Sequence, residues 1–209
     1  FEFERLEQTL KRAGDGVRMK RELDHLRNNQ QRVEFVVGKS PSFQQTLSYA
    51  KRAAQLSAPV LITGETGTGK EILSKFIHKS GPRRDKPFIA INCAAIQSTM
   101  LETELFGHEK GSFTSADKNK YGLMEIADDG ILFLDEISSM PMVIQAKLLR
   151  AIDEKSFRRV GGTNLIKVDV QIVAASNRNL PSMIEENEFR QDLYYRLKVV
   201  DLHLPPLRD

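Results

Sequence analysis

The segment GETGTGKE, at residues 64–71, contains the residue types and spacing that most directly indicate chemistry. It satisfies G-x-x-x-x-G-K and lies between an apolar run at 59–63 and a helical pattern at 70–80, which is the setting that a phosphate-binding loop (P-loop) requires. Glycines let backbone N–H groups turn inward around phosphate oxygens, and the following helix adds its positive N-terminal end. Lys70 would reach the β- and γ-phosphates. The residues expected to contact a nucleotide are Gly64, Glu65, Thr66, Gly67, Thr68, Gly69, Lys70 and Glu71.

Two adjacent acids, Asp135 and Glu136, end the apolar run ILFLDE at 131–136. Ligands of open α/β sheets bind at the carboxyl ends of the strands, and two acids there are costly unless a cation or a reaction uses them. Asp135 therefore fits a Mg²⁺ ligand, and Glu136 fits a base that orients the attacking water. Glu71 occupies the position where Ser or Thr would ligate Mg²⁺, so the metal would depend more on Asp135. A solvated turn is the alternative interpretation of the two acids.

Ser176 and Asn177 end a further apolar run, at 168–177. Both side chains are neutral hydrogen-bonding groups, and both are expected at the same edge of the sheet as the two acids. A simple turn would use the same residue types. The pattern alone therefore does not decide whether they face a nucleotide.

The elements that must position these residues alternate between strands and helices. Short, wholly apolar strands separated by helices predict an α/β fold with a parallel five-stranded sheet between helices. Residues 157–168 predict a hairpin around Gly161-Gly162. The predicted helices are 40–55, 70–80 and 141–157, and the predicted strands are 59–63, 87–92, 131–136, 168–177 and 198–204.

Residues 1–34 show heptad-like spacing of apolar residues, interrupted by AGDG at 13–16. This spacing predicts a helical linker. Two interpretations remain open: two amphipathic helices that pack on their own domain, or a connecting coiled coil that sets subunit contacts.

The composition excludes several classes of protein. With 40% hydrophobic and 28% charged residues, the chain is neither disordered nor fibrous. The net charge of +3 is too small to predict nucleic-acid binding. The single cysteine, Cys93, is expected to be buried and fits a reducing, cytoplasmic setting. No apolar run is long enough to span a membrane. The chain does not begin with Met, so it is interpreted as a piece of a longer protein.

Five segments in order resemble one family: GETGTGKE, FIAINCAAI, ELFGHEKGSFTSA, GILFLDEIS and FRQDLYYRL. They look like the central AAA+ ATPase domain of sigma-54-dependent transcriptional activators, and the resemblance covers residues 35–209. It implies ATP and Mg²⁺ as ligands, a homo-oligomeric ring (hexamer or heptamer), and sigma-54 RNA polymerase as partner. It also implies a lid and a DNA-binding domain outside this fragment. The start of the chain is similar to the end of a receiver domain, which suggests control by phosphorylation.

The resemblance also implies roles for single residues. Asp135 and Glu136 match the Walker B pair, and Ser176 with Asn177 matches the sensor I position. Asn92 matches the asparagine that restrains the catalytic glutamate until the client is engaged. Arg190 and Arg196 match two arginines that reach the nucleotide of the neighbouring subunit.

The segment GSFTSA, at 111–116, matches the family's client loop, whose exposed Phe and Thr touch sigma-54. Gly111, Phe113 and Thr114 are thus the expected contacts with the partner. Ser115 replaces a glycine of the family pattern, and Ser adopts positive φ less readily. This difference motivates an alternative in which the same ATPase acts on another client. A nucleotide-binding switch without turnover is the second alternative.

Overall fold

The computed structural model describes residues 40–113 and 116–206. The predicted helical linker at 1–34 lies outside these residues, as do Thr114 and Ser115 of the client loop. Among the helices of the described ranges, none is both long and apolar enough to cross a lipid bilayer.

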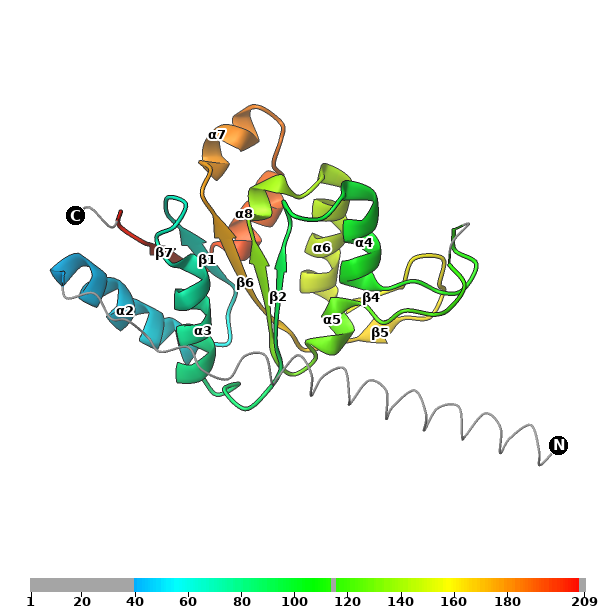
Figure 1. The fold of residues 1–209 in the computed structure, drawn as a ribbon, viewed down its shortest axis with the longest axis horizontal. Helices are drawn as coiled ribbons and strands as arrows, with labels where there is room; N and C mark the ends of the chain where they lie inside the picture. The colour runs from blue at the N-terminus through cyan, green and yellow to red at the C-terminus, as the bar shows by residue number, and fades with distance from the viewer. Residues whose placement is uncertain (1–39, 114–115, 207–209) are drawn as a thin grey trace. The chain divides into compact units, whose positions relative to one another are not determined.

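Five parallel strands form the central sheet, in the order β2-β3-β6-β1-β7 (Figure 1). The predicted fold class is confirmed. The strands are parallel because, between one strand of the sheet and the next, the chain crosses back to the edge at which the strands begin. The strands are β1 (Val60–Thr63), β2 (Phe88–Asn92), β3 (Ile131–Asp135), β6 (Gln171–Ser176) and β7 (Val200–His203).

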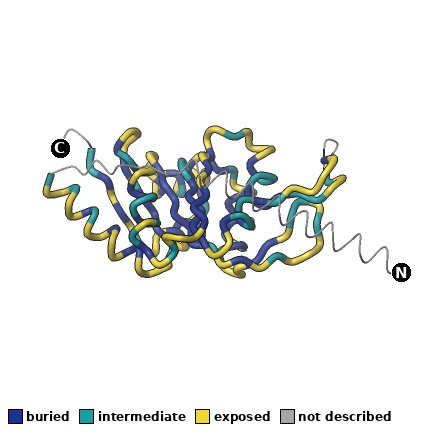
Figure 2. The backbone as a smooth tube through the Cα atoms, turned by 60° about the horizontal axis from the view of Figure 1, so that its bottom comes forward, coloured by how far each residue is buried: buried dark blue, intermediate teal, exposed yellow. Residues whose placement is uncertain are grey.

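Apolar side chains cover both faces of this sheet, as expected for strands without polar alternation. Ile62 and Phe133 point to one face, which α2 (Pro41–Ala54) and α3 (Lys70–Ser80) cover. Leu61 points to the other face. The helices on this second face are α4 (Ser98–Phe106), α5 (Leu123–Ile126), α6 (Met142–Glu154), α7 (Leu180–Glu185) and α8 (Gln191–Leu197). Figure 2 shows the strands as a buried centre between partly exposed helices.

The chain reverses direction after α6, and here one predicted boundary is wrong. The helix predicted to reach residue 157 ends at Glu154, because Lys155 takes a left-handed conformation (φ 48°). The next two residues form β4 (Ser156–Phe157), which pairs antiparallel with β5 (Ile166–Lys167). The hairpin predicted at 157–168 is therefore confirmed. Similarly, the strand predicted from 168 begins only at Gln171.

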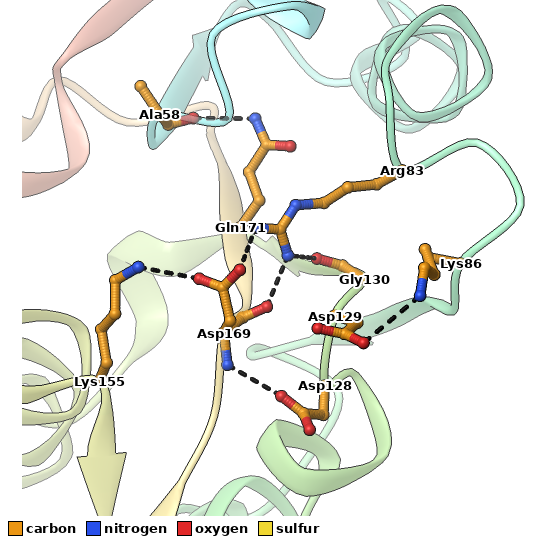
Figure 3. A network of polar contacts seen from close by, with 9 residues as sticks. All are labelled: Ala58, Arg83, Lys86, Asp128, Asp129, Gly130, Lys155, Asp169 and Gln171. Carbon is orange, nitrogen blue, oxygen red and sulfur yellow. Dashed lines mark hydrogen bonds and ion pairs between the residues drawn. The ribbon is translucent and has the colours of Figure 1, made fainter.

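A network of polar contacts lies at the edge where the strands begin, opposite the edge that carries the P-loop (Figure 3). The Arg83 guanidinium donates to the Gly130 carbonyl at 3.1 Å and to the Asp169 carboxylate at 2.8 Å. Lys155 donates to the other Asp169 oxygen at 2.9 Å. This hydrogen bond from Lys155, together with the charge of Arg83, lowers the pKa of Asp169. Because Gly130 precedes β3 and Asp169 precedes β6, the network fixes the starting points of two neighbouring strands.

Candidate functional site

The predicted site residues meet at the carboxyl edge of the sheet, and the strand registers explain why. Asn92 is directly opposite Asp135 in the β2–β3 pair, and Thr63, which leads into the P-loop, is opposite Ser176 in the β1–β6 pair. Four strands thus end level with one another, and each delivers a polar group to one rim. The P-loop begins at this rim, directly after β1.

The P-loop is shaped as a cradle of backbone N–H groups. Gly67 and Gly69 both have positive φ, 83° and 93°, which side chains rarely allow. In the described part of the chain, no protein acceptor is paired with the N–H of either glycine. The helix α3 starts at Lys70, so its N-terminal end faces the same space. This arrangement suits phosphate oxygens.

Lys70 is buried inside the cradle, with 7% of its surface exposed. Its ammonium group donates to the carbonyls of Gly64 and Glu65, both at 2.9 Å. Among the described residues, no carboxylate forms an ion pair with it. A buried cation is costly unless an anion balances it, so this lysine indicates an anionic ligand.

Asp135 and Glu136 emerge from β3 as the sequence predicts, and the backbone turns sharply between them. Glu136 is left-handed, with φ 51° and ψ 49°, and its N–H donates to Asp135 Oδ1 at 3.0 Å. Such a backbone costs free energy for a residue other than glycine and is typical of functional sites. Asn177 connects this turn to the P-loop. Its amide donates to Thr66 Oγ1 at 3.1 Å and makes a longer contact of 3.5 Å with Glu136 Oε1.

Asn92 contacts the first of the two acids. Its Nδ2 donates to Asp135 Oδ2 at 3.4 Å, and its Oδ1 accepts from the N–H groups of Ala94 and Ala95. In this structure Asn177, and not Asn92, is the asparagine that reaches Glu136. The next residue, Cys93, is buried as predicted. Burial, and then the charges of Asp135 and Glu136, raise the pKa of its thiol to about 12, so it is no nucleophile.

The two predicted arginines lie on and beside α8, each paired with an acid of the same chain. Arg190 binds Asp192 through two nitrogens, at 3.0 and 2.6 Å. Arg196 Nε lies 2.8 Å from Asp153 Oδ1. A pocket of about 370 Å³ beside the P-loop is lined by Gly64, Asn177 and Lys198, among others, but by neither arginine. The structure therefore does not bring these arginines to the P-loop of their own chain.

A buried glutamine holds the backbone that carries Arg190. The Gln145 side chain, fully buried in α6, accepts from the Arg190 N–H at 2.8 Å. It donates to the carbonyls of Met140 and Glu188. The beginning of α8 is thereby fixed to α6.

The client loop and the β4–β5 hairpin lie side by side (Figure 1). His108 pairs with Lys120 across the loop and with Val160 of the hairpin. Arg159 of the hairpin makes two hydrogen bonds with Glu125, at 2.9 and 2.7 Å, and one with Glu109 at 3.0 Å. These bonds, above all the one with Glu125, raise the pKa of Arg159. The Arg159 guanidinium thus links the hairpin to α5 through Glu125 and to the segment before the client loop through Glu109.

Phe113 is 40% exposed, whereas phenylalanine is usually buried. Its ring meets no hydrophobic core cluster and packs instead against the His108 ring. Gly111, also predicted to contact a partner, is exposed on the same loop.

A family model described as the sigma-54 interaction domain matches residues 36–203. The chain belongs to the sigma-54 interaction domain family. This is a family of P-loop NTPases, in agreement with the cradle around Lys70.

Two relatives are identical to this chain at about half of the aligned positions. The chain is 51% identical over 178 residues to the Nif-specific regulatory protein of Sinorhizobium fredii, covering 85% of this chain and 30% of that protein. It is 46% identical over 212 residues to the regulatory protein AtoC of Escherichia coli, covering 100% of this chain and 46% of that protein. The chain therefore spans less than half of either relative.

Solved structures agree with the fold. NtrX from Brucella abortus, crystallised in complex with ATP, has a TM-score of 0.77 at 39% identity, covering 99% of this chain and 43% of that chain. The P-loop NTPase domain of an Escherichia coli sigma-54 activator has a TM-score of 0.56 at 15% identity, covering 82% of this chain and 99% of that one; this likeness shows the fold alone.

The residues of the site fit a Mg²⁺ ion that is bound through a single carboxylate. No group of three or more His, Cys, Asp or Glu in residues 40–113 and 116–206 could hold a metal ion by itself. Mg²⁺ keeps several waters and binds through one or two carboxylates plus substrate phosphates. The carboxylate of Asp135, oriented by Glu136 N–H and by Asn92, fits this requirement.

Some contacts of the site were not predicted from the sequence. The contact between Thr66 and Asn177 depends on the order of the strands, which places β6 beside β1. The link between Arg159 and Glu125 joins residues 34 positions apart in segments without a regular hydrophobic period. The only signal for this link in the sequence was a basic and an acidic residue near the bases of two loops.

Proposed function

We propose that this chain is the ATPase core of a sigma-54-dependent activator, which hydrolyses Mg-ATP between the subunits of a ring. The ring would use this energy to remodel RNA polymerase bound to sigma-54. The observation that carries the proposal is Lys70, a buried cation without a carboxylate partner in the described part, in a cradle of glycine N–H groups. The two acids at the end of β3 complete a site suited to phosphoryl transfer.

Each residue at the edge of the sheet has a role in this reaction. Lys70 and the P-loop N–H groups hold the β- and γ-phosphates. Glu136 accepts a proton from the attacking water, and Asn177 holds the Glu136 carboxylate in position. Asp135 would hold Mg²⁺, which supplies positive charge against the charge that grows on the γ-phosphoryl group. Ser176 accepts from the Arg178 N–H and so fixes the turn that presents Asn177.

Arg190 and Arg196 would complete the site of a neighbouring subunit. A fixed cation beside the γ-phosphoryl group stabilises the transition state, and an arginine supplied in trans makes hydrolysis depend on assembly. Both arginines are half-exposed, and each is held by an acid of its own chain, Asp192 or Asp153. In a ring, each would exchange that carboxylate for the neighbour's triphosphate.

Mixing two inactive variants tests this arrangement. Arg196→Ala leaves the P-loop whole, and Lys70→Ala leaves the arginines whole, so a mixed interface can contain both groups. We expect ATPase activity per subunit of the parent to rise steeply with protein concentration, and the mixture to recover part of it. Phosphate release measures both. The double variant mixed with Arg196→Ala is the control and should recover nothing. Activity independent of concentration, without recovery in the mixture, would rule out action in trans.

The client loop would engage sigma-54 through Phe113. Its ring is exposed and apart from every residue that faces the nucleotide, so Phe113→Ala should keep ATPase activity and thermal stability. Truncation of a buried Phe costs about 3–5 kcal/mol, whereas this ring should cost clearly less. Capture of sigma-54 in the presence of ADP and aluminium fluoride should be lost.

Leu165→Ala is the matched control for this experiment. Leu165 is an apolar residue of the adjacent hairpin, 52% exposed, and its truncation should leave capture of sigma-54 intact. If Phe113→Ala captured sigma-54 as well as the parent does, the proposed role of the loop would be wrong.

A further inference from the structure

The ring of Phe113 rests edge-on against the ring of His108. Their centroids lie 4.9 Å apart, and the planes meet at 65°. This is the T-shaped geometry that aromatic pairs prefer. Phe113 is thus placed by one specific neighbour, although it lies on a loop and outside both core clusters.

His108 belongs to a backbone-paired part of the loop. Its N–H donates to the Lys120 carbonyl at 3.0 Å, and its carbonyl accepts from the Lys120 N–H at 2.9 Å. The adjoining residues, Gly107 and Glu109, each make a backbone hydrogen bond with Val160 of the hairpin, both at 3.0 Å. These backbone hydrogen bonds anchor the residue that carries the imidazole to both the loop and the hairpin. The Phe113 ring lies against this imidazole.

The same imidazole has a buried nitrogen that the structure leaves unsatisfied. His108 Nδ1 is shielded from solvent and has no hydrogen-bond partner in the described part of the chain. Such a nitrogen lowers stability, and an apolar ring at this position would avoid the cost. Among the described residues, the imidazole thus contacts Phe113 as a ring and not through a hydrogen bond of Nδ1.

We propose that His108 is a positioning residue for Phe113, and that it holds the client-contacting ring against the base of the loop. The inference rests on the proposed function and adds a step to it. Phe113 must leave His108 before it can bury its whole ring in a partner. The ring is thus in equilibrium between a docked position, on His108, and a free position that binds the client. The affinity for the client is then reduced by the fraction of molecules in the docked position.

A single tryptophan reports the position of this ring. The chain contains no tryptophan, so Phe113→Trp introduces a unique fluorophore. Adding His108→Ala should shift the emission of the introduced indole to longer wavelength and increase its quenching by acrylamide. The ratio of docked to free ring should fall by about 2- to 12-fold, the factor expected from one edge-to-face pair. Adding His108→Phe instead should restore the values of the single variant, because it keeps the ring contact.

His78→Ala is the matched control, because His78 also contacts a phenylalanine, Phe88, at 5.2 Å, but outside the client loop. It should leave the emission of the introduced indole unchanged. Unchanged quenching in His108→Ala, or failure of His108→Phe to restore it, would overturn the inference.

A second measurement needs no substitution of His108. The chain has only four histidines, so their ring protons can be resolved by NMR on histidine-labelled protein. The ring current of Phe113 should shift the His108 resonance, and Phe113→Leu should remove this shift while His78 and His203 stay unchanged. Absence of any change at His108 would contradict the docked ring even if the His108 variants failed to fold.

Affinity for sigma-54 separates this inference from the proposed function. With the natural Phe113, His108→Ala should bind sigma-54 up to about 12-fold more tightly, because the docked position no longer competes. A docked ring in a protein that never binds sigma-54 would contradict the proposed function alone. Binding to sigma-54 without a gain in His108→Ala would contradict this inference alone.

Discussion

Glu136→Gln should bind ATP like the parent and hydrolyse it about 10²–10⁴-fold more slowly, the usual effect of losing a general base. The amide keeps the size and the contact with Asn177 but cannot accept a proton from water. The left-handed backbone at this residue already fixes where the side chain leaves the strand. Equilibrium binding of a fluorescent ATP analogue and single-turnover hydrolysis measure the two effects separately.

Glu185→Gln is the isosteric control for this experiment. Glu185 is an exposed acid on α7, and its amide should hydrolyse ATP at the parent rate. If Glu136→Gln instead weakened ATP binding and left turnover per bound ATP unchanged, Glu136 would be a binding residue and not the base.

Arg159→Ala should lower the free energy of unfolding by about 1–3 kcal/mol, the cost of leaving a partly buried hydrogen-bonding group without its partner. The side chains of Arg159 and Glu125 are 15% and 9% exposed, so the variant leaves a partly buried carboxylate without its partner. The guanidinium also lies 4.6 Å from the centre of the Tyr121 ring, and that contact is lost as well. Urea denaturation followed by circular dichroism measures the difference.

The neighbouring arginine is the natural control, because Arg158 donates to Thr163 at the exposed side of the hairpin. Arg158→Ala should change stability by less than about 0.5 kcal/mol. Arg159→Lys should recover only part of the loss, because an ammonium group cannot make the paired hydrogen bonds to Glu125. Equal stabilities of the Arg158→Ala and Arg159→Ala proteins would show that the ion pair does not stabilise the packing of the hairpin against α5.

The positions of the candidate site residues were largely predictable because these residues follow strands at fixed positions. Lys70 and Asp135 could be placed at one rim from the order of apolar runs and glycines alone. Ser176, ambiguous as a sequence signal, was placed there by its register with Thr63. The residues lie at one edge because a parallel sheet collects strand ends in one place.

Contacts between loops could not be predicted in the same way. The partner of Asn177 and the reach of Arg159 depend on side-chain directions that no hydrophobic period encodes. The end of α6 was also misplaced. Residues 155–157 fit the helical pattern, but Lys155 ends the helix with a left-handed backbone, and Ser156–Phe157 pair with β5. Tertiary contacts here override local propensity.

The close approach of Gly161 to the client loop has a consequence for how sequences of this kind can diverge. A methyl group on Gly161 would lie 2.5 Å from Ser112 Cβ, and the φ of 74° there also disfavours a side chain. Side chains at positions 112 and 161 therefore compete for the same small space. A larger side chain at either site would push the hairpin away from the loop, even though the two lie 49 residues apart along the chain. Grafting a client loop from a relative would thus require the matching hairpin turn to be transferred with it.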